Sequence, residues 1–232
     1  MNMIIDYLGH SGFLVETADA LMLFDYERGD LGVLERKPAG KPLYVFVSHI
    51  HGDHFNPMIF TLKGRTIRYI LSFDLKGDDR VPQDRDVRFV DADKIYDIAG
   101  LGTVETLLST DEGVAFLVRT KDTVLFHAGD LHWWDWPGED PAWLQEQETV
   151  FRREISRLSG VPIDAAFVVL DDRLEENYAG GMMLFLELCR AKYVLPMHFW
   201  NDRSVIARFR ELAGTAAGTV LLDTANENHW EL

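Results

Sequence analysis

Short hydrophobic segments separated by turn residues fill the first half of the chain. They are rich in Val, Ile, Leu, Phe and Tyr, which is typical of strands. We expect strands at residues 3–8, 12–16, 21–24, 43–47, 67–71, 87–90, 104–108, 113–119 and 123–127. The segment 43–47 (LYVFV) has no polar position, which predicts a strand that is buried on both faces.

Helical and strand-like segments alternate in the second half. We expect helices at 141–158, 178–190 and 204–212, and strands at 165–170, 193–196 and 219–222. Asn56-Pro57 predicts one more helix start, with Asn as the N-cap and Pro in the first turn. The segments 29–42 and 74–86 resemble surface loops. Because no repeat or linker interrupts this pattern, we expect one α/β domain over residues 1–232.

Composition and charge argue against nucleic-acid and membrane partners. The 232 residues are 47% hydrophobic, which is enough for a sizeable core, and 38 acidic against 23 basic residues give a net charge of -15. Lys and Arg are scattered, so we expect no nucleic-acid partner. The single cysteine, Cys189, excludes an intrachain disulfide and is expected in the core. No segment is long and apolar enough to span a bilayer, so we expect a soluble, cytoplasmic protein without membrane contact.

Potential metal ligands follow the buried segment 43–47 directly, in the run S-H-I-H-G-D-H. His49 and His51 are two residues apart on an extended segment, so both imidazoles project to the same side and can share one metal ion. Asp53 and His54 add two ligands within the same short run, a set of nitrogen and oxygen donors suited to divalent ions. The alternative is a polar loop whose histidines only form hydrogen bonds. We favour the metal site.

Two later segments also place a ligand-type residue after a strand. Asp130 follows the segment 123–127 in F-H-A-G-D, and His198 follows the segment 193–196 in L-P-M-H. Loops held at the ends of sheet strands commonly build functional sites. We therefore expect both residues to join the histidine run.

The order H-x-H-x-D-H, then G-D after a strand, then a late His resembles the metallo-β-lactamase superfamily. Its fold is an αββα sandwich, two mixed β-sheets packed between helices. The segments Y-L-G-H-S-G-F and P-M-H resemble the branch of metal-dependent hydrolases like ascorbate-6-phosphate lactonase. The resemblance implies that His49 and His51 bind a first metal ion and that Asp53, His54 and His198 bind a second. It also implies that Asp130 bridges the two.

One ligand of the superfamily pattern is missing. A further histidine usually binds the first ion shortly before the Gly-Asp block, but residues 107–113 read L-L-S-T-D-E-G. Asp111 is the predicted replacement, because carboxylates also bind zinc, manganese and iron. Two alternatives are a water held by Ser109 and a plain turn that leaves the first ion weakly bound. We expect one or two zinc ions, with manganese or iron as alternatives.

Three residues are expected close to the metal ligands. His127 either binds a metal ion directly or supports a ligand, and the second role is at least as well founded. By analogy with the branch, His10 and Asp25 lie beneath the site, where Asp25 would orient a ligand. His132 and His229 are expected in a loop and on the surface.

Aromatic residues supply the expected substrate contacts. Trp133 and Trp134 follow Asp130 closely, and Tyr178 precedes a helix. They either wall a substrate pocket or belong to the core at the sheet edge.

The resemblance also implies a function. A metal-dependent hydrolase would use a metal-bound hydroxide on a small-molecule ester, lactone or phosphodiester, with Asp53 orienting the hydroxide or carrying a proton. Two alternatives remain: a metal-binding protein with little catalysis, and a non-hydrolytic di-iron redox protein. Redox members usually carry Glu at the position of His51. Members of the superfamily often associate, so a homo-oligomer is also expected.

Overall fold

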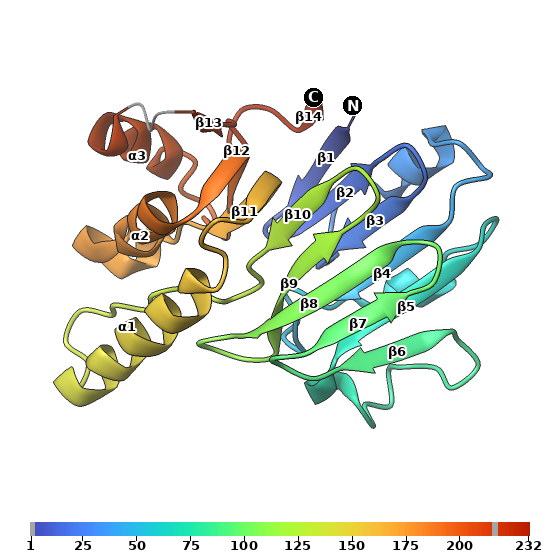
Figure 1. Cartoon of the computed structure of the whole chain (residues 1–232), viewed down its shortest axis with the longest axis horizontal. Coiled ribbons are helices and arrows are strands. Elements are labelled where there is room, and N and C mark those ends of the chain that lie inside the picture. The colour runs from blue at the N-terminus through green and yellow to red at the C-terminus, as the bar shows by residue number, and fades with distance from the viewer. Residues whose placement is uncertain (1–2, 215–217) are drawn as a thin grey trace.

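A computed structural model of the chain describes residues 3–214 and 218–232. Two seven-stranded mixed sheets lie face to face (Figure 1). The first has the order β14-β1-β2-β3-β4-β5-β6 and the second the order β13-β12-β11-β10-β9-β8-β7. The strands of the first sheet are β1 (Ile4–Gly9), β2 (Gly12–Glu16), β3 (Leu21–Phe24), β4 (Leu43–Val47), β5 (Ile67–Ser72), β6 (Val87–Val90) and β14 (His229–Glu231). Those of the second are β7 (Ile95–Ile98), β8 (Gly102–Leu108), β9 (Val114–Arg119), β10 (Val124–His127), β11 (Pro162–Val169), β12 (Arg190–Met197) and β13 (Val220–Leu221).

Aromatic side chains join the two sheets. Phe46 of β4 packs edge-on against Phe116 of β9 at 5.2 Å between ring centroids, and Phe13 of β2 contacts Phe167 of β11 at 4.4 Å. Every residue of β4 is buried, as the run without polar positions predicts. Part of the main core therefore lies between the sheets.

Different kinds of helix cover the two outer faces. The second sheet carries α1 (Pro141–Ser156), α2 (Gly180–Leu188) and α3 (Val205–Ala213), which contribute Phe151, Phe185 and Phe209 to the main core (Figure 1). A second hydrophobic cluster on the first sheet includes residues of three 3-10 helices, η1 (Leu31–Arg36), η2 (Pro57–Thr61) and η3 (Phe73–Leu75). A fourth, η4 (Asp172–Asn177), follows β11. The expected sandwich between helices is confirmed, and the layer on the first sheet consists of 3-10 turns.

These turns correct two loop assignments. Within 29–42, η1 buries Val33 and Leu34, and within 74–86, η3 buries Leu75, so both segments cover the sheet. The helix start at Asn56 is present, since its side chain accepts a hydrogen bond from the Met58 amide, but the helix is a 3-10 turn.

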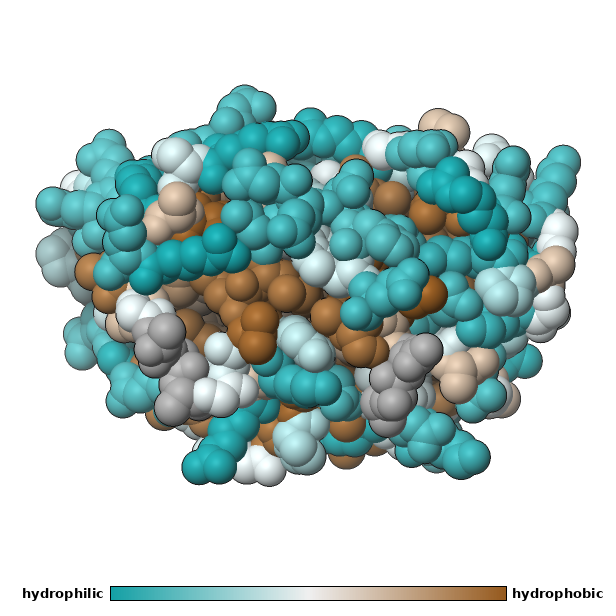
Figure 2. All heavy atoms as spheres, turned by 90° about the horizontal axis from the view of Figure 1, so that it is seen from above, coloured by the Kyte–Doolittle hydropathy of each residue, from teal (hydrophilic) through white to brown (hydrophobic). Residues whose placement is uncertain are grey.

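β7 and β14 are not among the strands that the sequence pattern predicts. Both are edge strands with few buried side chains, so their hydrophobic signal is weak. In the view from above, hydrophilic residues cover most of the surface and hydrophobic ones gather in the middle of this face (Figure 2). No helix in the described ranges is long and apolar enough to cross a membrane.

Candidate metal centre

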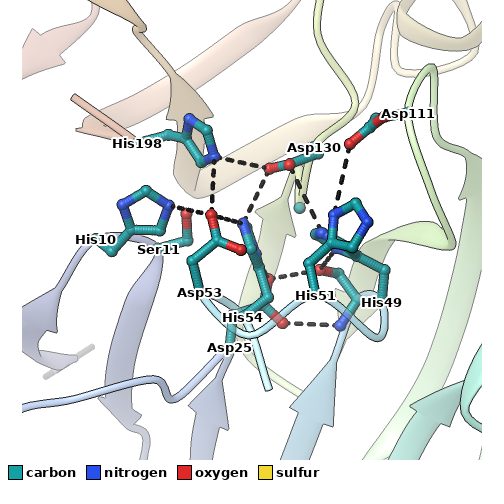
Figure 3. Close-up of polar contacts among 12 residues, drawn as sticks. His10, Ser11, Asp25, His49, His51, Asp53, His54, Asp111, Asp130 and His198 are labelled. Carbon is teal, nitrogen blue, oxygen red and sulfur yellow. Dashed lines mark hydrogen bonds and ion pairs between the residues drawn. The ribbon is translucent and has the colours of Figure 1, made fainter. Parts of the chain in front are cut away.

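The predicted ligands come together at one edge of the sandwich (Figure 3). The loop after β4 carries His49, His51, Asp53 and His54. The β1–β2 turn carries His10, and loops of the second sheet carry Asp111, Asp130 and His198. Segments far apart in the sequence thus converge because their strands end at the same edge.

Their ligand atoms fall into two groups, and the atoms within each group lie within 4.8 Å of one another. The first ligand group consists of His49, His51, Asp111 and Asp130, and the second of His10, Asp53, His54 and His198. Asp111 therefore lies where the missing histidine is expected. Its Oδ2 is 3.8 Å from Nδ1 of His51.

Asp130 lies between the two groups. Its Oδ2 is 3.6 Å from Nε2 of His49, while its Oδ1 is 3.1 Å from Nε2 of His54 and 3.4 Å from Nε2 of His198. One carboxylate thus faces histidines of both groups, which is the arrangement expected of a bridging ligand.

Buried atoms without hydrogen bonds test whether these groups fit a metal ion. Four such atoms point into the space between the groups, Nε2 of His49, His54 and His198 and Oδ1 of Asp130, and none forms a hydrogen bond with a described residue. Leaving buried polar atoms unpaired is costly, so each is expected to have a partner. Nitrogen and carboxylate donors without sulfur suit a divalent ion such as zinc, manganese or iron. The residues present therefore fit a metal centre.

Asp25 orients two histidines from below. Its Oδ2 accepts a hydrogen bond from Nδ1 of His54 at 2.8 Å, and its Oδ1 accepts one from the amide of Ser48 at 2.7 Å. The Ser48 hydroxyl donates to Asp25 and therefore accepts from Nδ1 of His49 at 2.9 Å. Because both Nδ1 atoms act as donors, both Nε2 lone pairs are left for a metal ion.

Asp171 orients His198 in the same way, although no sequence pattern marked it as a site residue. Its Oδ2 accepts a hydrogen bond from Nδ1 of His198 at 2.9 Å. Asp171 directly follows Leu170 at the end of β11, the strand beside β12, whose loop carries His198. An acidic residue after a strand that neighbours a ligand-bearing strand is the signal that could have identified it.

Burial and the neighbouring carboxylates give His49 and His54 opposite protonation states. Burial lowers the pKa of His49 to about 4, so this imidazole is neutral near pH 7. Burial also opposes charge on His54, but the Asp130 and Asp25 carboxylates outweigh it and raise its pKa well above the usual value. The charges of His198 and His54 outweigh the burial of Asp130 and hold its pKa well below the usual range. A bound cation would replace the proton of His54.

The backbone is strained at three residues of the site. His10, Asp25 and His198 have φ values of 50°, 39° and 66°, in the left-handed region that non-glycine residues seldom occupy. Such strain persists where the surrounding structure holds it, and it clusters at functional sites. The amide of His198 donates to the carbonyl of His10, at 3.2 Å, and so links two of these residues.

Comparison with known proteins agrees with this geometry. A family model described as "Beta-lactamase superfamily domain" matches residues 4–135. The chain belongs to the metallo-β-lactamase superfamily. It is 21% identical over 233 residues to a protein of Pyrococcus furiosus named "UPF0173 metal-dependent hydrolase", an alignment that covers 94% of this chain and 95% of that protein.

Two solved structures share the metallo-β-lactamase fold of this chain. Igni18, a metallo hydrolase from Ignicoccus hospitalis, has a TM-score of 0.71 at 14% identity, with 100% of this chain and 99% of that chain covered. CmlA, a diiron beta-hydroxylase from Streptomyces venezuelae, has a TM-score of 0.62 at 13% identity, with 99% of this chain and 54% of that chain covered. The predictions of superfamily and fold are confirmed.

His127, whose role was open, does not face this metallo-β-lactamase site as a ligand. Its Nε2 donates to the carbonyl of Ser11 at 2.9 Å, and its Nδ1 accepts from the amide of Gly129 at 3.1 Å. The ring also stacks on Phe24, with 5.0 Å between centroids. Because both nitrogens are occupied, His127 holds the loop of Asp130 in place.

His10 lies closer to the ligands than expected for a residue beneath the site. Its Nε2 is 3.2 Å from Oδ2 of Asp53, and its ring centroid is 4.2 Å from that of His198. His10 is therefore within reach of the second metal position and supports Asp53 there.

A cavity of about 290 Å³ opens over the ligands. Its lining consists of His51, Asp53, Thr110, Asp111, Asp130, Trp134, Trp136, Trp143, Arg173, His198 and Trp200. Trp134 lies in this wall and also belongs to the main core, so both positions considered for it apply. Its indole N–H donates to the carbonyl of Asp130 at 3.1 Å, which ties it to the metal centre.

The prediction that Trp133 and Tyr178 contact the substrate is corrected, because neither residue lines this cavity. Arg152 lies 5.7 Å from the ring centroid of Trp133, and Arg208 lies 4.9 Å from that of Tyr178. Side chains two apart on an extended segment share a side. The alternation of residues 133–136 could therefore have assigned Trp134 and Trp136 to one wall.

His132 lies in the loop between β10 and α1, as expected, but it is not a solvent-facing residue. Its side chain is fully buried, and a Cβ atom added to Gly181 would lie 2.3 Å from its ring. It packs edge-on against Trp134, at 5.0 Å between centroids. His229, by contrast, is half exposed and pairs with Asp6 at 2.7 Å.

Proposed function

We propose that this chain binds two divalent metal ions and hydrolyses a small-molecule ester, lactone or phosphodiester. The observation that carries the proposal is the set of four buried, unpaired ligand atoms of His49, His54, His198 and Asp130. The superfamily and the name of the Pyrococcus furiosus relative support the general class of metal-dependent hydrolase.

The two ligand groups would each hold one ion. The first ion would bind His49, His51 and Asp111, the second would bind Asp53, His54 and His198, and Asp130 would bridge them. When bound, such ions lower the pKa of a coordinated water and polarise the oxygen of the substrate.

The side chains of this chain then orient the reactants. Burial opposes the charge of Asp53, but the contact with the His10 imidazole and the charge of His54 outweigh it and lower the pKa of Asp53. An ionised carboxylate that is 29% exposed can accept a hydrogen bond at the floor of the cavity. Asp53 would therefore orient the nucleophile or accept its proton.

The size and charge of the molecule support a small substrate. A cavity of about 290 Å³ is near the lower limit for ligand pockets. The net charge of -15 disfavours a nucleic-acid substrate. The single cysteine, Cys189, is buried, in keeping with a reducing compartment, and a cytoplasmic location stays a prediction.

The test joins metal content with activity. Protein purified without chelator is expected to hold two ions per chain by elemental analysis and to hydrolyse members of a panel of esters, lactones and phosphodiesters. His51→Ala should lose one ion, and Asp53→Ala should lose activity even when reloaded with metal. His229→Ala is the matched control outside the site.

Each contrary result has a definite meaning. Protein without metal after growth in replete medium would refute the metal centre, and full activity of metal-loaded Asp53→Ala would refute the role of Asp53. Two iron ions with electron transfer and no hydrolysis would instead favour the redox alternative.

A further inference from the structure

The cavity contains an arginine that the metal centre does not use. Arg173 pairs with Asp171, with Nε 2.9 Å from Oδ1 and 3.0 Å from Oδ2. Its guanidinium carbon also lies 5.4 Å from the ring centroid of Trp136 and 4.7 Å from that of Trp200. A carboxylate and two aromatic rings therefore fix the plane of the guanidinium.

One end of this guanidinium remains free. Nε and Nη2 bind Asp171, but Nη1 forms no hydrogen bond with any residue in the described ranges. The side chain is 43% exposed and lines the cavity. Because its orientation is already fixed, Arg173 can donate to a ligand at a low entropic cost.

Indole rings form much of the remaining wall. Trp134 and Trp136 are nearly parallel, with an interplanar angle of 4° and centroids 5.9 Å apart. Trp143 and Trp200 line the same cavity, although 37% and 38% of their surfaces are exposed. Large aromatic side chains are usually covered, and an exposed set around a cavity is typical of a site for a planar or apolar group.

The charge balance of the cavity depends on the metal centre. Its lining contains three carboxylates, those of Asp53, Asp111 and Asp130, and Arg173 is the only Lys or Arg in it. The metal-free cavity is therefore negative and would repel an anion. Two divalent ions would reverse that sign, so the loaded cavity would attract one.

We infer that the substrate is a small anion whose carboxylate or phosphate pairs with Arg173 while its planar or apolar body packs on the tryptophans. The inference rests on the proposed hydrolase and adds the class of substrate. The oxyanion would bind at Nη1, and the scissile group would reach the metal ions. Arg173 would thus determine specificity.

Tryptophan fluorescence gives a test that needs no turnover. Metal-loaded protein is titrated with benzoate, phenyl phosphate and neutral benzamide. We expect at least one of the two anions to bind about tenfold or more tightly than benzamide, since hydrogen bonds to charged groups are the stronger ones. The tighter of the two anions identifies the oxyanion.

Variants then assign this preference to Arg173. Arg173→Lys keeps the charge without the planar fork and should weaken binding of that anion, whereas Arg173→Met should remove its advantage over benzamide. Arg208→Met is the matched control, because Arg208 also lies over an aromatic ring and pairs with a carboxylate, Asp202, but lies outside the cavity.

Metal content is measured for every variant, because Arg173 also contacts the carboxylate that orients His198. If Arg173→Met loses metal, its loss of anion binding has no clear cause. Arg173→Lys and Trp200→Leu then test the inference, and both are expected to weaken anion binding at full metal content. Equal binding of benzamide and both anions, or unchanged anion binding in these two variants, would overturn the inference. Anion binding without any hydrolysis would refute the proposed function alone.

Discussion

Oδ2 of Asp171 accepts a hydrogen bond from Nδ1 of His198, and the same oxygen also accepts hydrogen bonds from Nε and Nη2 of Arg173. The hydrogen bond to His198 and the pairing with Arg173 outweigh the burial of Asp171 and lower its pKa, so it stays ionised. One carboxylate thus connects a candidate metal ligand with a cavity residue.

Replacement of Asp171 should weaken metal binding without removing a ligand. In Asp171→Ala, His198 loses the partner that fixes its tautomer, and metal affinity is expected to fall by about 10- to 100-fold. Competition with a chromophoric chelator measures the affinity. Asp172→Ala, one residue away, is the control. Equal affinities in the two variants would show that Asp171 does not support the site.

A histidine, which the superfamily usually has at this position, should be able to replace Asp111. Asp111→Ala is expected to lower the metal content from two ions to one, whereas Asp111→His should keep two. Glu112→Ala, which changes the neighbouring exposed carboxylate, serves as the control. Unchanged stoichiometry in Asp111→Ala would exclude Asp111 as a ligand.

Gly129 should tolerate no side chain. It has a φ of +51°, and an added Cβ would lie 2.6 Å from Cβ of Ser48, the residue that supports His49. Gly138 has a φ of +85° but open space around it, so Gly138→Ala is the matched control. We expect a loss of about 1 kcal/mol in unfolding free energy for Gly138→Ala and roughly 2–4 kcal/mol for Gly129→Ala. Urea denaturation measures both, and equal losses would contradict the steric argument.

The buried His132 should make the metal-free protein sensitive to acid. Burial lowers its pKa to about 4, below the 6.5 of an exposed imidazole, so the unfolded state binds a proton more readily. Its contribution to the free energy of unfolding is full above pH 6.5 and declines as the pH falls toward 4, by up to about 3 kcal/mol.

Urea denaturation of the metal-free protein between pH 6.5 and 4 measures how the free energy of unfolding declines. His132→Asn should show a shallower decline than the unchanged chain, although His49 contributes in the same direction in both. An unchanged slope would mean that His132 does not cause the acid sensitivity.

The convergence of the candidate ligands could be predicted from the sequence because they follow strands with strong hydrophobic patterns. His49, Asp130 and His198 come shortly after β4, β10 and β12, and the sheets bring these strand ends together. Asp171 was missed for a different reason. It lies 27 positions from His198, and their contact depends on the pairing of β11 with β12, where Val169 lies opposite Met197. No local pattern contains that register.

The cavity was harder to predict than the metal centre. Arg173 lies in a short acidic run that reads as a solvated loop, and only the bound carboxylate and the two indole rings give it a fixed place. The position of His132 depends equally on a distant helix, since Gly181 of α2 leaves the space that its ring occupies.

The pairing of β14 with β1 has a consequence for the growing polypeptide. Asp6 and His229, which lie opposite each other in these strands, are 223 positions apart. On the ribosome, the side of β1 that pairs with β14 therefore stays unpaired until residues 229–231 have been synthesised. Until then its unpaired backbone groups are free to join another strand, which makes this nascent edge a target for chaperones and a site where aggregation would begin.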